Sequence, residues 1–241
     1  TTLSATSTDS TSGISTFEVN VNNTGWVSYS ETTFTDGFNT IQYRATDNAG
    51  NVTETAIQEI KVDTVTPVIN ISTTGTLGLN SWYVSSVTMT ATSSDTTSGI
   101  ASFEMNVNNT GWGTYTENTF TDGVHSIQYR ATDNAGNTYT TTTQEIKVDT
   151  TTPSLDLSII GTKGQNDWYT SLTSVTPTAT DAGSGIASIE YRLNNGTLNL
   201  YTSPLQFTDG INSYQIKITD YAGNTTITPT QTIKVDTIAP V

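Results

Sequence analysis

The chain of 241 residues contains no cysteine, a single histidine and only eight lysines and arginines. Without cysteine, neither disulfides nor thiolate metal sites are available. No apolar run approaches the ~18 residues of a membrane-spanning helix, and no signal peptide is recognisable, so any export or anchoring signal is expected outside these residues. The lack of cysteine does not exclude secretion, because a repeat domain can fold on its hydrophobic core alone.

Positive charge is scarce, since Asp and Glu outnumber Lys and Arg by 22 to 8 and the formal net charge is -14. A field of this sign repels phosphate backbones and anionic headgroups, which excludes nucleic acid and membrane surfaces as natural partners. Cations are the expected counterions. Hydrophobic residues make up 33% of the chain and charged residues 12%, and Thr, Ser and Asn fill much of the rest. Such a mixture is typical of short strands with hydroxyl-rich solvent faces.

Internal repeats dominate the sequence. The run Asp-Asn-Ala-Gly-Asn at residues 47–51 returns at 133–137 and, as Asp-Tyr-Ala-Gly-Asn, at 220–224. A period of about 86 residues built from strand-like segments predicts one complete β-domain per repeat, and not a coil of a solenoid. The predicted units are residues 1–66, 67–152 and 153–239, with 240–241 beginning a further repeat.

The first repeat is expected to lack its opening strand, because nothing in it matches residues 68–86. Two explanations stay open. The sequence is a window cut out of phase from a longer array, or a neighbouring chain supplies the strand by β-augmentation in a polymer.

The second repeat shows the strand pattern most clearly. Strands are predicted at residues 68–72, 82–84 and 112–116, and others are indicated by apolar residues that alternate inward. These inward positions are Val87, Met89 and Ala91; Phe103, Met105 and Val107; Ile127, Tyr129 and Ala131; and Ile146 and Val148. Seven or so short strands separated by turn signals predict a Greek-key β-sandwich.

The sandwich topology makes a specific prediction about charged residues. The strand that carries Phe103 neighbours the strand that carries Tyr129, so outward residues of the two strands face each other. We expect a cross-strand ion pair in each repeat, worth at most ~1 kcal/mol because it is exposed. The pairs are Glu18–Arg44, Glu104–Arg130 and Glu190–Lys217.

Three motifs resemble the immunoglobulin-like tandem domains of large bacterial surface proteins and adhesins, which also occur as accessory modules of secreted enzymes. They are Ser-Gly-Ile at residues 12–14, 98–100 and 184–186, the Asp-x-Ala-Gly-Asn corner, and the Val-Asp-Thr-x-x-Pro exit at residues 62–67. The resemblance covers essentially the whole chain. It implies tandem immunoglobulin-like sandwiches arranged as a rod, with a spacer, adhesive or filament-building role that calcium sometimes stiffens at domain junctions.

The acidic residues permit a calcium hypothesis on their own chemistry. The loops after Ala91 and after Ala131 are expected at the pole where the chain enters the second repeat, beside the linker. Carboxylates gathered there would repel unless water separates them or a hard cation such as Ca²⁺ bridges them. The alternative is that each Asp caps its own turn. The candidate metal ligands are Asp36, Asp63, Asp95 and Asp133 at the first junction and Asp122, Asp149, Asp181 and Asp220 at the second.

The sequence offers little for catalysis. His125, the only histidine, is replaced by Asn39 and Asn212 in the equivalent positions and is expected to be an exposed strand residue. No nucleophile motif or metal-binding helix motif is present. We therefore predict no enzymatic activity and no catalytic residues.

Aromatic residues provide the main alternative. Trp26 and Trp112 follow tight turns, and Trp82-Tyr83 and Trp168-Tyr169 precede strands, so their rings could stack on sugars. Tryptophan in small sandwiches more often covers the end of the core. The third repeat has no Trp near Leu198, which weakens a shared ligand site.

These features together predict a non-enzymatic, extracellular cell-surface array that acts as a stalk, surface fibre or filament body. Its expected partners are neighbouring repeats of the same protein, with self-assembly into a fibre or surface layer. The alternative function is a carbohydrate-binding accessory module with a glycan as its ligand.

Overall fold

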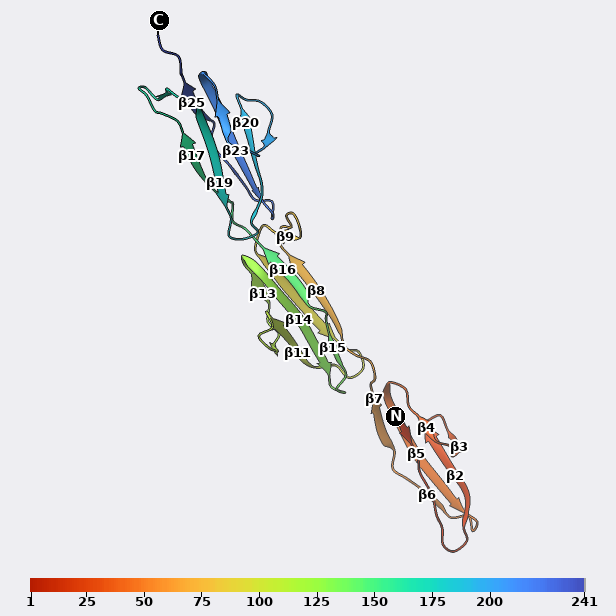
Figure 1. Cartoon of the computed structure of the whole chain (residues 1–241). Coiled ribbons are helices and arrows are strands. Elements are labelled where there is room, and N and C mark those ends of the chain that lie inside the picture. The colour runs from red at the N-terminus through yellow and green to blue at the C-terminus, as the bar shows by residue number, and fades with distance from the viewer. Residues whose placement is uncertain (241) are drawn as a thin grey trace.

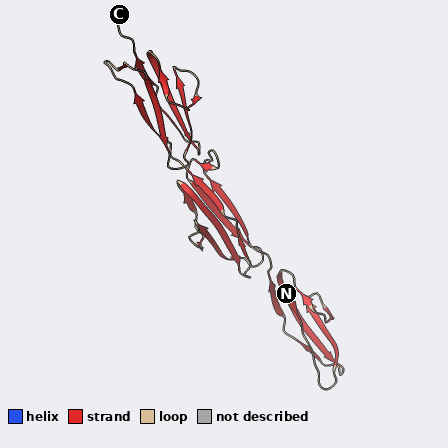
Figure 2. Ribbon diagram, viewed as in Figure 1, coloured by secondary structure: helices blue, strands red, loops and turns tan. Residues whose placement is uncertain are grey.

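The computed structural model describes residues 1–240, in which strands alternate with turns and loops and no helix occurs (Figure 2). Among these residues, accordingly, no helix has the length and hydropathy that crossing a membrane requires. Three strand-rich units follow one another along a rod (Figure 1). We call them repeat 1 (β1 to β7), repeat 2 (β8 to β16) and repeat 3 (β17 to β25). The predicted all-β class is confirmed.

Repeat 2 shows the complete architecture. Its strands are β8 Val68–Thr74, β9 Trp82–Tyr83, β10 Val87–Ser94, β11 Ile100–Val107, β12 Gly113–Thr114, β13 Asn118–Phe120, β14 Gly123–Asp133, β15 Thr138–Thr140 and β16 Gln144–Val148. One sheet has the order β13-β10-β8, and the other has the order β12-β11-β14-β16-β9, with β15 also paired to β14. The chain crosses between the sheets on both sides of β9, after β10 and on both sides of β13, which is the Greek-key sandwich expected from the sequence.

Repeat 3 copies this arrangement strand for strand. Its strands are β17 Ser154–Ile160, β18 Trp168–Tyr169, β19 Thr173–Thr180, β20 Ile186–Leu193, β21 Asn199–Leu200, β22 Leu205–Phe207, β23 Gly210–Asp220, β24 Thr225–Ile227 and β25 Gln231–Val235. The parallel pair β18–β25 repeats the parallel pair β9–β16.

Repeat 1 differs at one edge. Its strands are β1 Thr2–Leu3, β2 Ile14–Val21, β3 Trp26–Ser28, β4 Thr32–Thr33, β5 Gly37–Asp47, β6 Val52–Glu54 and β7 Gln58–Val62. Within residues 1–66 no strand takes the place of β8, and β1 pairs with β4 alone. A groove of about 510 Å³, lined in part by Phe17, Tyr43 and Ala45, lies open there. In repeat 2, Ile69 and Ile71 of β8 pack against the corresponding core.

Period-two alternation builds the cores. Residues of β10, β14 and β16 point alternately inward, because successive side chains of a strand face opposite sides of the sheet. The predicted inward residues of these three strands are all buried, at 0–6% exposure: Val87, Met89, Ala91, Ile127, Tyr129, Ala131, Ile146 and Val148. Phe103, Met105 and Val107 of β11 are half-buried against the same cluster.

The last strand of each sandwich is interrupted, which the sequence did not indicate. In repeat 2, Thr141 separates β15 from β16, and its Oγ1 accepts a hydrogen bond from the Tyr129 main-chain N at 3.0 Å. The threonine hydroxyl thus accepts the hydrogen bond that a main-chain carbonyl of a continuous strand would accept. The strand can therefore be interrupted here without leaving the Tyr129 N–H unpaired. Thr55 and Thr228 do the same in the other repeats. The predicted strand at 112–116 is also shorter and begins after Trp112.

The three predicted ion pairs are confirmed. Glu104 lies directly opposite Arg130 in the register of β11 and β14, and the two side chains meet at 2.8 Å. The pairs Glu18–Arg44 and Glu190–Lys217 repeat this geometry at 2.9 Å and 3.0 Å.

In two of these pairs the arginine also lies over a tryptophan ring. The Arg130 guanidinium carbon lies 4.3 Å from the centre of the Trp112 ring, and that of Arg44 lies 4.4 Å from the centre of Trp26. Each guanidinium is therefore fixed between a carboxylate and a π face. Repeat 3 has no tryptophan at this position, so Lys217 relies on Glu190 alone.

This difference predicts unequal effects of removing the carboxylate. Glu104→Gln should lower the stability of repeat 2 by ~0.5–1 kcal/mol at low salt, because the charged pair is lost while Arg130 stays stacked. Glu190→Gln in repeat 3 should cost less, because a flexible lysine makes one hydrogen bond. Urea unfolding at low and high salt measures the stability change of both variants, and each change should become smaller at high salt because salt screens the ion pair. If Glu190→Gln lowers the free energy of unfolding more than Glu104→Gln does, the proposal that Trp112 fixes Arg130 for its ion pair is contradicted.

The buried Tyr129 makes stability sensitive to alkali. Burial raises the pKa of its phenol to about 12 from 10.0, and the neighbouring Tyr115 adds to the effect. The neutral phenol is thus favoured in the folded state, so its contribution is complete below pH 10 and is lost as the pH rises toward 12. We expect the thermal midpoint of the wild type to fall in this window relative to Tyr129→Phe. Tyr139→Phe, whose ring is exposed, is the matched control and should follow the wild type.

Candidate functional site: the carboxylate-lined junctions

The junctions between repeats are built around a linker aspartate. Asp63 follows β7 and Asp149 follows β16, so each stands where the chain leaves one sandwich for the next. The Asp149 main-chain N still belongs to repeat 2, because it donates to the Tyr83 carbonyl at 2.9 Å. Its side chain is fully buried, whereas Asp63 is half-buried.

A second aspartate at each junction comes from the loop after β10 or β19. Asp95 Oδ1 accepts main-chain N–H groups of Thr97, Ser98 and Gly99 at 3.0, 2.8 and 3.0 Å. Asp181 holds its loop through the N–H groups of Gly183 and Gly185 at 3.1 and 2.7 Å. These aspartates therefore cap their own turns, as the turn interpretation of the sequence expected.

A third aspartate comes from the Asp-x-Ala-Gly-Asn corner. In repeat 2, Asp133 Oδ1 accepts the N–H groups of Ala135 and Asn137, and its Oδ2 accepts Asn137 Nδ2. In repeat 3, Asp220 makes the same two bonds to Asn224 and accepts the N–H of Gly223, whereas the N–H of Ala222 donates to Ser184 Oγ. Both carboxylates are buried, at 1% and 0% exposure.

The three aspartates of each junction converge. One carboxylate oxygen from each of Asp63, Asp95 and Asp133 lies within 4.8 Å of the others. Asp149, Asp181 and Asp220 form the same arrangement at the second junction. Three of the four residues proposed for each junction are thus brought together by the structure.

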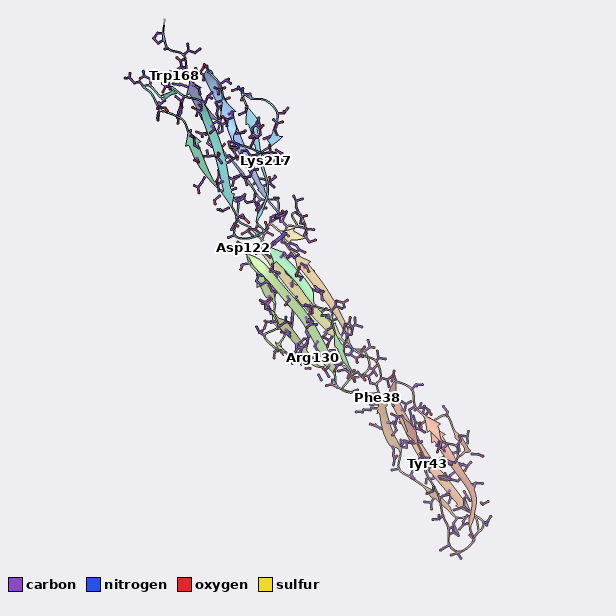
Figure 3. The ribbon with its side chains drawn as sticks, viewed as in Figure 1. Phe38, Tyr43, Asp122, Arg130, Trp168 and Lys217 are labelled. Carbon is purple, nitrogen blue, oxygen red and sulfur yellow. The ribbon has the colours of Figure 1, made fainter. Side chains whose placement is uncertain are left out.

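The fourth residue of each set stays outside the cluster. Asp36 Oδ1 accepts the main-chain N–H of Thr64 at 2.9 Å, and Asp122 Oδ1 accepts that of Thr150 at 2.8 Å. The threonine hydroxyls also bond to these carboxylates. Figure 3 shows Asp122 at the end of repeat 2 that faces repeat 3. Asp36 and Asp122 therefore hold the start of the linker and do not join the converging oxygens.

The charge state of two cluster members follows from their contacts. Burial raises the pKa of Asp149, but hydrogen bonds from Ser184 and Thr151 outweigh it and leave the pKa below its ordinary value. Desolvation also raises the pKa of Asp95, and the N–H groups of its own turn reverse the effect. Both groups are therefore ionised at neutral pH, and each cluster is a concentration of negative charge.

Asparagine side chains join the repeats in a way that the sequence analysis missed. Asn137 Nδ2 donates to the Asp63 carbonyl at 3.1 Å, and Asn224 Nδ2 donates to the Asp149 carbonyl at 2.9 Å. The last residue of the corner thus bonds both its own aspartate and the incoming linker. This asparagine recurs at the end of the corner in each repeat, and its recurrence was the sequence signal that could have indicated the contact with the linker.

A loop of repeat 2 also reaches repeat 3. Leu79 N donates to the Ala222 carbonyl at 2.8 Å, and Asn80 Nδ2 donates to the Tyr221 carbonyl at 2.9 Å. Gly78 is required there, because a Cβ would overlap the Ala222 oxygen. The first junction instead has a groove of about 550 Å³ lined by residues that include Phe38, Lys61 and Asn134. In Figure 3, Phe38 lies at the end of repeat 1 that faces repeat 2.

The residues considered for sugar binding or catalysis have structural contacts. The arginines that lie over Trp26 and Trp112 cover one face of each ring. His125 is half-buried, not exposed as expected, because Nε2 lies 2.8 Å from the Thr121 carbonyl and the ring packs on Phe120. Asn39 and Asn212 make the corresponding bond through Nδ2.

Several known structures share features of this chain. The fibronectin(III)-like modules of Clostridium thermocellum CbhA are 12% identical, with a TM-score of 0.31 and coverage of 70% of this chain and 93% of that one. Domains of a 1.5-MDa bacterial ice-binding adhesin are 17% identical, with a TM-score of 0.33 and coverage of 91% and 85%. Bacteroides ovatus SGBP-B, solved with a mixed-linkage heptasaccharide, is 11% identical, with a TM-score of 0.19 and coverage of 92% and 60%.

Comparison with family models is more direct. No curated protein matches the sequence. A model described as "Bacterial Ig-like domain" matches residues 2–64 and 166–237, and one described as "Bacterial Ig-like domain (group 3)" matches residues 109–193. The resemblance noted in the sequence motifs is thus confirmed, and the chain belongs to the bacterial Ig-like domain family.

Proposed function

We propose that the chain is a non-enzymatic spacer of an extracellular surface protein, a rod whose joints are tightened by Ca²⁺. The observation that carries this proposal is the convergence of three carboxylates at each of two consecutive junctions. Membership of the bacterial Ig-like family supports a structural or adhesive module at the cell surface.

The arrangement of the repeats suits a spacer. Their long strands run along the rod, and in repeats 2 and 3 the chain enters at one pole and leaves at the opposite pole (Figure 1). A strand of 11 residues such as β14 spans ~37 Å, so three repeats in line extend on the order of 100 Å. Linker prolines Pro67 and Pro153 are buried, and they restrict the backbone where one sandwich meets the next.

Calcium fits the chemistry of the junctions. Ca²⁺ binds carboxylate and carbonyl oxygens at about 2.3–2.6 Å, so one ion can contact oxygens that lie up to ~5 Å apart. The oxygens of each cluster lie within 4.8 Å of one another. At the first junction, Asp63 Oδ2 is buried and has no hydrogen-bond partner among the described residues. A bridging cation would neutralise the like charges and join linker, loop and corner in one unit.

The partners that follow from this function are neighbouring repeats of the same protein, stacked pole to pole. The exposed apolar residues at the repeat ends support assembly into a fibre or surface layer. Glycan binding receives less support, because arginine side chains cover one face of Trp26 and Trp112.

Small-angle X-ray scattering tests the rod and its joints together. In Ca²⁺ the chain should scatter as an extended rod with a maximum dimension on the order of 100 Å. A chelator should leave each sandwich folded but broaden the distribution of shapes, because the carboxylates of a joint then repel. Asp63→Asn with Asp149→Asn should lower Ca²⁺ affinity in calorimetry at least tenfold, and Asp156→Asn, an exposed strand residue, is the matched control.

Two outcomes would overturn these proposals separately. Scattering from a compact particle in both conditions would reject the spacer. A rod that neither binds Ca²⁺ in calorimetry nor responds to the chelator would reject the metal and leave a metal-free spacer.

A further inference from the structure

The two junctions of this chain share three converging aspartates and a corner asparagine, but their linker carboxylates make different bonds. At the second junction, Asp149 Oδ2 accepts the main-chain N–H of Ser184 from repeat 3 at 2.7 Å. At the first, the corresponding N–H of Ser98 bonds to Asp95 within its own loop. The linker carboxylate therefore bonds across the joint in one case and not in the other.

One residue accounts for the different bond of the linker carboxylate, and the contacts of Leu79 and Asn80 with repeat 3 are a separate difference between the junctions. The loops read Asp95-Thr96-Thr97-Ser98 and Asp181-Ala182-Gly183-Ser184, so Gly183 stands where repeat 2 has Thr97. A Cβ at Gly183 would overlap the Asp149 carboxylate. The Asp149 carboxylate thus occupies the space that a side chain at residue 183 would need, and the corresponding residue at the first junction, Thr97, has a side chain.

The unsatisfied atoms agree with this explanation. Asp63 Oδ2 and Ser98 Oγ are both buried and both lack a partner among the described residues. Their counterparts are satisfied, since Asp149 Oδ2 accepts Ser184 N and Ser184 Oγ accepts Ala222 N at 2.9 Å. The bond of Asp149 crosses the joint and that of Ser184 Oγ lies within repeat 3, and at the first joint both acceptor atoms are without a partner while their donors bond to Asp95 and Asp133.

We infer that Gly183 is the coupling residue of this rod: it lets the linker aspartate lock repeat 3 onto repeat 2, whereas Thr97 leaves the joint between repeats 1 and 2 free to bend. The lock consists of hydrogen bonds alone, so it acts without a cation. The inference needs only one part of the proposed function, namely that the repeats lie in line. It does not depend on calcium.

The absence of cysteine allows a direct measurement. Spin labels at Ile57→Cys with Thr143→Cys report on the first joint, and labels at Thr143→Cys with Thr230→Cys report on the second. All three are exposed residues that precede the last strand of their repeat. Double electron–electron resonance in the presence of a chelator gives the distribution of distances between the two labels. A broad distribution indicates a joint that bends.

We expect the second joint to give a narrower distribution than the first. Gly183→Thr should broaden it, and Thr97→Gly should narrow the distribution of the first joint. Gly113→Thr is the matched control, because Gly113 has no positive φ and its added Cβ meets no atom within 4 Å.

A second variant keeps the test decisive if Gly183→Thr misfolds. Asp149→Ala removes the acceptor without changing the loop and should also broaden the second joint, whereas Asp156→Ala should not. Equal widths for the two wild-type joints, or a second joint unchanged by both Gly183→Thr and Asp149→Ala, would overturn the inference. Because the chelator removes cations, neither result bears on the calcium proposal.

Discussion

Aspartate carboxylates that accept main-chain N–H groups organise the loops at the poles of each repeat. No disulfide supports the repeats, and each has a single small core. The loops at the poles expose N–H groups that no strand can satisfy, and a buried N–H without a partner is costly. Asp9, Asp95 and Asp181 satisfy them in the loops that follow β1, β10 and β19, and Asp47, Asp133 and Asp220 do so in the corner. The negative charge of the poles follows from this use of aspartate.

The sequence predicted what depends on local periodicity. Strict alternation identified the buried faces of β10 and β14, and the register of β11 with β14 followed closely enough to place Glu104 opposite Arg130. It did not predict which N–H group each carboxylate would accept. Asp36 and Asp122 were grouped with the junction by their position at a pole, but a threonine one residue beyond the linker aspartate binds them instead. The break at Thr141 was also invisible, because a hydroxyl that replaces a carbonyl leaves the apolar pattern unchanged.

Repeats with the same fold and the same junction aspartates can differ in the contacts that their joints make. Repeats 2 and 3 keep the same three aspartates and the same asparagine at the joint, so a sequence comparison treats the joints as equivalent. One glycine changes which atoms the linker aspartate reaches, and with that the stiffness assigned to the joint. An array of such modules can combine rigid and bending joints without any change in fold, since the choice lies in one loop residue and not in the core.

The course of the terminal strands determines how force would pass through a repeat. β8 enters repeat 2 at one pole and pairs with β10 along its length, and β16 leaves at the other pole beside β14 (Figure 1). Tension between the ends of the rod therefore acts along these strands, at right angles to their hydrogen bonds. All the bonds of a strand are loaded together in shear and cannot be peeled apart one by one. Repeats 2 and 3 are thus arranged to bear tensile load along the rod.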